Sequence, residues 1–145
     1  MERALRTCWQ EEGIYRFARD GRPVYAIDTP PPTVSGLLHL GHVYSYSQTD
    51  FIARYRRMIG DDVLYPMGYD DNGLPTERLV EKTIGVRATD IGRQAFIEKC
   101  LQISEETERN YQELWERLGL SVDWQNTYRT IDDDSRRLSQ LSFLD

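Results

Sequence analysis

The sequence is poor in the residues from which several kinds of site are built. It has two cysteines and two histidines in 145 residues, which is too few for a disulfide framework or a zinc finger. Cys8 and Cys100 form no CxxC pair and suit a reducing, cytoplasmic compartment. No apolar run approaches the roughly 20 residues that a membrane span needs, so we expect no membrane partner. The first residues do not form a signal peptide.

Positive charge and the common catalytic motifs are also scarce. The chain has 18 Lys and Arg against 24 Asp and Glu, a net charge of −6, so no global positive field attracts nucleic acid. It contains neither GxxxxGK[ST] nor GxGxxG, and no GxSxG nucleophile motif. Any nucleotide must therefore be bound by other groups. The apolar content of 39% before glycine is counted is that of a globular domain.

Short apolar runs alternate with longer helical patterns along the chain. The predicted order is a helix over 2–19 interrupted by Gly13, a strand over 24–27, a helix over 37–59, a strand over 63–65, and helices over 75–83, 92–118 and from about 132 onward. A strand, a long helix and a second strand are typical of a βαβ unit. The pattern therefore predicts an α/β fold with a parallel sheet.

Ligands of such sheets lie at the carboxyl ends of the strands, where the sequence places two loops, 29–38 and 66–74. The first loop contains Pro30-Pro31-Pro32, which predicts a stiff, extended connection. The second contains Asp70 and Asp71, and one carboxylate at the carboxyl end of a strand is well placed to bind a cationic group such as an ammonium. On composition alone, an Asx turn is the more frequent explanation of the second loop.

The two histidines lie three residues apart near the start of the long helix. On a helix His39 and His42 share one face, where free backbone N–H groups and the helix dipole attract anions. Gly41 costs about 1 kcal/mol relative to alanine inside a helix, which a ligand lying against the backbone would explain. Two ordinary surface histidines beside a helix cap explain the spacing equally well. We expect no metal site, because no third histidine or nearby cysteine completes one.

Two longer segments resemble motifs of the class I aminoacyl-tRNA synthetases. Residues 30–42 (PPPTVSGLLHLGH) resemble the H-I-G-H signature with its upstream proline loop, and residues 67–77 (MGYDDNGLPTE) resemble the G-x-D-x-x-G-x-x-x-[EQ] block. An HxGH motif alone would be shared with small nucleotidylyltransferases. The pattern P-P-P-x-V-[ST]-G is similar to the valyl enzymes. The sequence around Asp70 is more similar to the leucyl and isoleucyl enzymes, so the leucyl and isoleucyl enzymes remain alternatives.

The resemblance implies a ligase that activates an amino acid, preferably valine, with ATP and transfers it to tRNA. It assigns catalysis to His39 and His42, ATP binding to Gly36, His39, Gly41 and His42, and amino-acid binding to Pro31, Pro32, Thr33 and Asp70. The implied cofactors are ATP and the Mg²⁺ that accompanies it. The implied partners are the amino acid, ATP and tRNA.

By the same resemblance, residues 1–22 form an N-terminal helical extension. Residues 23–145 form the first half of a Rossmann-like nucleotide-binding catalytic domain and end near the expected editing-domain insertion. The chain contains no K-M-S-K-S loop. We therefore expect an N-terminal fragment with little or no turnover by itself, or alternatively an inert fragment that still binds ATP.

Overall fold

The computed structural model describes residues 2–144, which form two compact units. The first unit takes in Met1–Pro30, His39–Met67 and Trp115–Thr127, and the second takes in Pro31–Leu38, Gly68–Leu114 and Tyr128–Asp145. Each unit is therefore assembled from segments that are distant in the sequence. Within residues 2–144, no helix is both long enough and apolar enough to cross a membrane.

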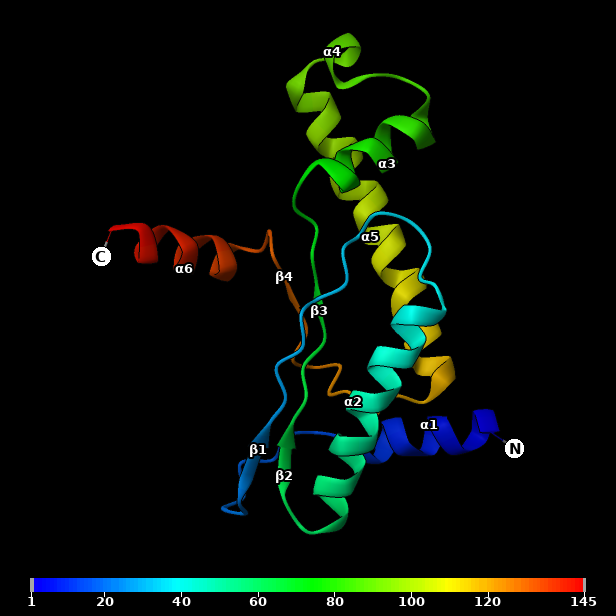
Figure 1. Cartoon of the computed structure of the whole chain (residues 1–145), viewed down its shortest axis with the longest axis vertical. Helices are drawn as coiled ribbons and strands as arrows, with labels where there is room; N and C mark the ends of the chain where they lie inside the picture. The colour runs from blue at the N-terminus through cyan, green and yellow to red at the C-terminus, as the bar shows by residue number, and fades with distance from the viewer. Residues whose placement is uncertain (1, 145) are drawn as a thin grey trace. The chain divides into compact units, whose positions relative to one another are not determined.

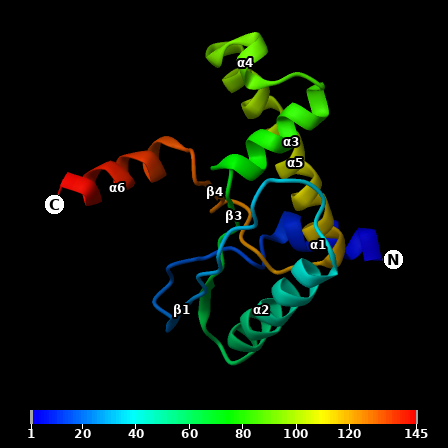
Figure 2. The same ribbon diagram turned by 45° about the horizontal axis from the view of Figure 1, so that its top comes forward.

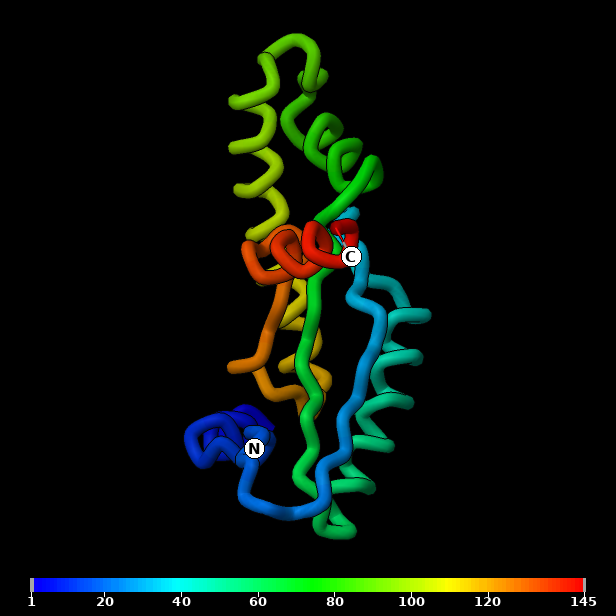
Figure 3. The backbone as a smooth tube through the Cα atoms, turned by 90° about the vertical axis from the view of Figure 1, so that its left-hand side faces the viewer, coloured from blue at the N-terminus to red at the C-terminus, as the bar shows by residue number. Residues whose placement is uncertain are grey.

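The first unit is built on a βαβ arrangement. Strand β1 (Val24–Ala26) lies beside β2 (Asp62–Leu64), and helix α2 (Leu40–Met58) connects them (Figures 1 and 3). The two strands are parallel, with Val24 opposite Asp62 and Ala26 opposite Leu64. The parallel pairing predicted from the order of strand, long helix and strand is thus confirmed.

Helix boundaries in this unit differ from the predicted ones. Helix α1 (Glu2–Glu12) ends at Glu12, seven residues before the predicted limit, because Gly13 adopts a left-handed conformation with φ of +61°. Helix α2 begins at Leu40, three residues later than predicted, because His39 is extended and caps the helix. Its carboxyl end is as expected, with Gly60 at φ of +102° just past Ile59.

A buried carboxylate ties α2 to the segment that follows helix α5 (Arg93–Leu118). Asp50 is 5% exposed, and its Oδ1 accepts hydrogen bonds from the backbone N–H and the hydroxyl of Ser121, both at 2.6 Å. Its Oδ2 lies 2.7 Å from Nε of Arg54. Because buried charges are costly unless they are paired and hydrogen-bonded, this full set of partners is what allows Asp50 to be buried.

The second unit contains a separate parallel pair of short strands, β3 (Gly68–Tyr69) and β4 (Tyr128–Arg129). Its helices are α3 (Leu74–Ile84), α4 (Ala88–Ile91), α5 up to Leu114, and α6 (Asp133–Leu144). Helix α4 links α3 to α5 at one end (Figure 1), and α6 extends away from β4 (Figure 2). Strand β3 falls inside the predicted second loop, so that part of the prediction was wrong.

The glycine that begins β3 explains why the strand was missed. Gly68 suggests a turn in the sequence, but in the structure it accommodates a neighbour: a Cβ atom at this position would collide with the side chain of Tyr128. Gly68 pairs with Tyr128 in the parallel register. Glycine in a strand often marks such a close approach.

Three charged side chains fasten β4 to α5 inside the second unit. Nη2 of Arg129 lies 2.5 Å from Oε1 of Glu108, and Nε of Arg129 lies 3.6 Å from Oδ2 of Asp71. Neither Asp71 oxygen has a hydrogen-bond donor among the described residues. A protonated Glu108 carboxyl would be such a donor. Burial, followed by the hydrogen bond and charge of Asp71, raises the pKa of Glu108 to about 7, although Arg129 opposes the shift.

We predict that Asp50→Ala lowers the free energy of unfolding by about 3 kcal/mol, because it leaves the Ser121 N–H and the Nε–H of Arg54 without their acceptor. Urea denaturation of the chain followed by circular dichroism measures the change. Asp20→Ala is the matched control, since it removes a carboxylate from the exposed Arg22–Asp20 pair in the same unit. An Asp50→Ala variant as stable as Asp20→Ala would contradict this account.

The Glu108 cluster predicts a specific pH dependence. Because the pKa of Glu108 is raised from 4.5 to about 7, the folded chain retains this proton over a range in which the unfolded chain loses it. The contribution of this proton to the free energy of unfolding is therefore complete below about pH 4.5 and is lost as the pH rises through about 7. In Glu108→Gln the side-chain amide is a donor at every pH, so the melting temperature should no longer fall between pH 4.5 and 8. Glu105→Gln, on the exposed side of α5, should show the same fall in melting temperature as the wild type. Parallel profiles for wild type and Glu108→Gln would contradict the assignment.

Candidate functional site

The two histidines form the amino-terminal cap of α2. Nδ1 of His39 accepts a hydrogen bond from the backbone N–H of Gly41 at 3.1 Å, and Nδ1 of His42 accepts one from the backbone N–H of His39 at 3.2 Å. The ring centroids are 4.1 Å apart, so the two rings are adjacent, although His39 is the extended N-cap and does not lie on the helix as predicted. Two of the N–H groups expected to be free for an anion are thus bound by the imidazoles themselves.

These cap bonds determine which ring nitrogen is available to a ligand. A nitrogen that accepts a hydrogen bond carries no proton, so each neutral ring has its proton on Nε2. Burial, and to a smaller extent the charge of His39, lowers the pKa of His42, which favours the neutral form at neutral pH. Each imidazole therefore offers one Nε2–H donor beyond the helix terminus, suited to an anionic oxygen.

The structure gives Gly41 a second explanation. A Cβ atom at this position would lie 2.8 Å from Cε1 and 3.0 Å from Nδ1 of His39. Any larger residue would displace the ring that caps the helix. The glycine is thus already required by the His39 cap, whether or not a ligand lies against the backbone.

In the second unit, the proline segment (residues 31–36) pairs with the segment around Asp70. Thr33 and Asp70 form a parallel bridge. The backbone N–H of Val34 donates to the carbonyl of Asp70 at 2.8 Å, and the N–H of Asp70 donates to the carbonyl of Pro32 at 3.0 Å. The two segments predicted as loops are therefore joined at their centres by a short parallel ladder.

The Asp70 carboxylate is oriented from both sides. Oδ2 accepts from the Thr33 hydroxyl at 3.3 Å, and Oδ1 accepts from the Thr130 hydroxyl at 3.2 Å. The N–H of Asn72 also approaches Oδ1 at 3.4 Å, which is the hydrogen bond of an Asx turn. The Asx turn and the oriented carboxylate thus coexist. A carboxylate has about four lone-pair sites, so acceptor capacity remains for an ammonium.

Two further side chains hold the proline segment in place. The Tyr111 hydroxyl lies 2.6 Å from the carbonyl oxygen of Gly36 and 3.1 Å from that of Thr33. The Thr76 hydroxyl donates to the carbonyl of Val34 at 2.9 Å. Sequence reasoning did not identify Tyr111, Thr76 or Thr130 as part of the site. Thr76 lies within the block at residues 67–77, and Thr130 lies within residues 128–132 (YRTID), which also resemble the valyl pattern, but neither was given a role.

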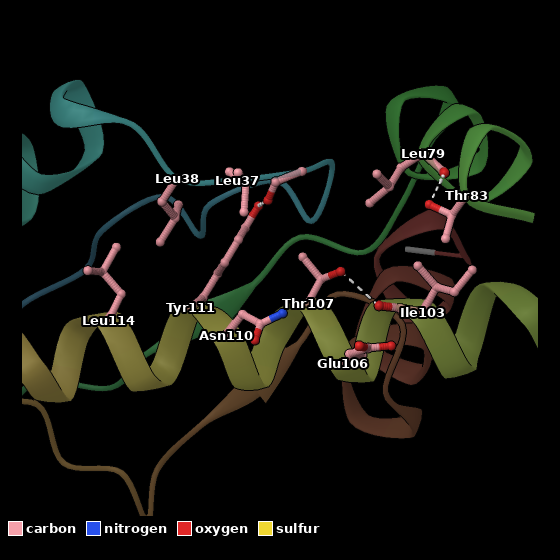
Figure 4. Close-up of a pocket in the computed structure, with 11 residues that line it drawn as sticks. Leu37, Leu38, Leu79, Thr83, Ile103, Glu106, Thr107, Asn110, Tyr111 and Leu114 are labelled. Atoms are coloured by element: carbon pink, nitrogen blue, oxygen red, sulfur yellow. Dashed lines mark hydrogen bonds between the residues drawn. The ribbon is translucent and has the colours of Figure 1, made fainter.

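A cavity of about 400 Å³ lies between the end of the proline segment, α3 and α5 (Figure 4). Leu37, Leu38, Leu79, Ile103 and Leu114 give it apolar walls, and Glu106 and Asn110 contribute polar atoms. Gly36 lines it, whereas Asp70, Thr33 and the two prolines do not. It is therefore distinct from the amino-acid site predicted around Asp70.

The predicted site residues fall into two groups. His39, Gly41 and His42 lie together in the first unit, and Pro31, Pro32, Thr33, Gly36 and Asp70 lie in the second. Pro32 is buried and Pro31 half-buried. Each group is well organised by its own hydrogen bonds. That the two groups serve one pair of substrates stays a prediction.

Comparison with known proteins reveals close relatives. The chain is 51% identical over 144 residues to the valine--tRNA ligase of Ehrlichia canis (strain Jake), and 51% identical over 146 residues to that of Rickettsia akari (strain Hartford). Each match covers 99% of this chain and 18% of the relative. The valine--tRNA ligase of the Wolbachia of Brugia malayi (strain TRS) is 47% identical, with 17% of its length covered. The chain thus spans less than a fifth of the relatives it matches.

A solved structure supports the same relationship. The crystal structure of the ternary complex of Agrobacterium radiobacter K84 agnB2 LeuRS, tRNA and LeuAMS matches 97% of this chain and 16% of that chain, with a TM-score of 0.80 and 26% identity. The predicted α/β fold, of the kind found in a Rossmann-like catalytic domain, is confirmed. The family model for tRNA synthetases class I (I, L, M and V) matches residues 4–143, and the chain therefore belongs to this family.

Proposed function

We propose that this chain supplies the first ATP- and amino-acid-binding elements of a valine--tRNA ligase. The observation that carries the proposal is about 50% identity to valine--tRNA ligases over nearly the whole chain. The capped histidine pair and the oriented Asp70 carboxylate provide the groups that such a reaction needs. Leucine and isoleucine remain the alternative substrates, because residues 67–77 resemble the leucyl and isoleucyl enzymes more than the valyl ones.

The histidine pair is suited to the triphosphate of ATP. His39 and His42 each use Nδ1 in the helix cap, which leaves Nε2 of each ring to face a ligand, and Gly41 makes room for the His39 ring. Such donors favour the charge that builds up on phosphate oxygens as pyrophosphate leaves. Gly36, which ends the proline segment, is proposed as a further ATP contact. Mg²⁺ is proposed to accompany the nucleotide, since it is commonly bound through substrate phosphates.

The Asp70 group is suited to the amino acid. Its carboxylate pairs with the α-ammonium, while Pro31, Pro32 and Thr33 form one wall for a small apolar side chain. A carboxylate oxygen of the amino acid then attacks the α-phosphorus of ATP, and the bond to pyrophosphate breaks. In the second step a ribose hydroxyl of the terminal tRNA adenosine attacks the acyl carbon and AMP leaves. Neither step needs a nucleophile from the protein, since positioning supplies much of the rate.

The remaining proposals come from the family resemblance of the motifs. We propose that residues 1–22 form a helical extension and residues 23–145 part of the catalytic domain, that tRNA is the acyl acceptor, and that the protein acts in the cytoplasm. The family's K-M-S-K-S loop does not occur in these 145 residues. We therefore expect the isolated chain to bind ATP or valine weakly and to turn over little.

Valine-dependent exchange of pyrophosphate into ATP, measured in the natural protein that contains this sequence, tests the amino-acid assignment. We expect valine to be preferred over isoleucine and leucine. Asp70→Asn should raise the KM for valine about 10- to 100-fold, since a charge-assisted bond to the ammonium is lost, and leave the KM for ATP nearly unchanged. Asp90→Asn, in the exposed pair with Arg87 on α4, is the matched control. A preference for leucine would contradict the valine assignment.

The two roles of His39 can be separated by substitution. Asparagine is a strong helix cap, so His39→Asn keeps an acceptor for the Gly41 N–H but removes the outward Nε2–H. We expect unchanged thermal stability and a kcat for exchange lowered by about 100-fold, the usual effect of losing one such donor. His39→Ala should lose both properties. Wild-type kcat in His39→Asn would mean that the imidazole serves only as a cap.

A further inference from the structure

Thr130, which follows β4, joins two neighbouring acids through its hydroxyl. The backbone N–H of Asp71 donates to Oγ1 of Thr130 at 3.0 Å, and the same Oγ1 lies 3.2 Å from Oδ1 of Asp70. Because the Asp71 N–H has only a proton to offer, Oγ1 accepts there. Its own proton is then directed at the Asp70 carboxylate. The backbone thus determines the direction in which this hydroxyl donates.

Thr130 is itself well anchored by its backbone. Its N–H donates to the carbonyl of Tyr69 at 3.0 Å, and its carbonyl accepts from the side-chain amide of Asn72 at 3.3 Å. On the amino-terminal side, Arg129 bonds to Glu108. On the carboxyl-terminal side, Asp132 accepts from the backbone N–H groups of Arg129 and Ser135 at 2.9 and 2.7 Å. Both neighbours of Thr130 are therefore fixed.

Each Asp70 oxygen consequently has one hydroxyl donor, and the two donors come from opposite sides. Thr33, from the proline segment, holds Oδ2, and Thr130, from the end of β4, holds Oδ1. Two fixed donors restrict rotation of the carboxylate plane before any ligand arrives. Preorganisation of this kind improves binding because less conformational freedom is lost on association.

We propose that Thr130 is a positioning residue for amino-acid binding, which acts by orienting the Asp70 carboxylate toward the α-ammonium. The inference rests on the proposed role of Asp70 in binding that ammonium. It adds a residue 60 positions away in the sequence, outside both motifs that identify the family.

The test uses pyrophosphate exchange in the natural protein that contains this sequence. Thr130→Val keeps the shape and removes the hydroxyl, and we expect the KM for valine to rise about tenfold with the KM for ATP within twofold of wild type. Thr130→Ser restores the hydroxyl and should return the KM for valine to within about threefold. Thr89→Val is the matched control, because the Thr89 hydroxyl also lies 3.2 Å from a carboxylate oxygen, that of Asp90, on exposed α4.

A double-mutant cycle that combines Thr130→Val with Asp70→Asn separates the role of Thr130 from the role of Asp70. If Thr130 acts through Asp70, Thr130→Val adds less than twofold to the KM for valine when Asp70 is already Asn. An unchanged KM for valine in Asp70→Asn would overturn the role of Asp70 and the inference with it. A raised KM in Asp70→Asn but a wild-type value in Thr130→Val would overturn the inference alone, as would equal increases in the KM values for valine and ATP.

Thermal melts monitored by circular dichroism accompany these assays. If Thr130→Val is unfolded at the assay temperature, Thr130→Ala and Thr130→Ser are compared at a temperature at which both are folded. A KM for valine at least fivefold higher in Thr130→Ala than in Thr130→Ser supports the inference. Equal values overturn it.

Discussion

The parallel bridge between Thr33 and Asp70 is the contact on which the proposed amino-acid site depends. Its two backbone hydrogen bonds, at 2.8 and 3.0 Å, join a proline-rich segment to the segment that follows β2, although 37 residues separate them. The prolines make this possible, because a stiff segment loses little conformational entropy when it is fixed. Pro32 has no N–H to donate, but its carbonyl is free and accepts the N–H of Asp70. Tyr111 and Thr76 then secure the same segment at Gly36, Thr33 and Val34.

The histidine pair shows how one side chain can support the fold and still be available for chemistry. Nδ1 of each ring is used to cap α2, a role more often filled by Ser, Thr, Asp or Asn. The short side chains of those residues reach only the cap, whereas the imidazole ring has a second nitrogen, Nε2, with a proton to donate. A histidine cap therefore makes sense where a donor is wanted just beyond the helix terminus. This argument also accounts for Gly41, whose missing side chain makes room for the capping ring.

Much of the outline was predictable from the sequence, because strand, long helix and strand leave few arrangements other than a parallel βαβ unit. The position of Asp70 at a strand end was predictable for the same reason. Strands β3 and β4 were not, since each has two residues and Gly68 suggests a turn. The hydrogen bond between Thr130 and Asp70 was not predictable either, because it forms only when β4 pairs with β3. Nor does the sequence reveal that His39 is extended, since histidine is not a preferred cap.

If Asp70 binds the α-ammonium as proposed, the geometry indicates where side-chain selectivity would come from. Every amino acid has an α-ammonium, so Asp70 cannot distinguish valine from leucine or isoleucine. The proposed proline wall would distinguish them, and the bridge attaches it directly to Asp70: the N–H of Asp70 is bonded to the carbonyl of buried Pro32. The proposed ammonium anchor and the proposed wall are therefore joined by a backbone hydrogen bond, which would fix the space available to a side chain between them. A rigid wall excludes larger side chains by steric clash, but it gains only about 1–3 kcal/mol per methylene against smaller ones. Selectivity against smaller side chains must therefore draw on contacts beyond this wall.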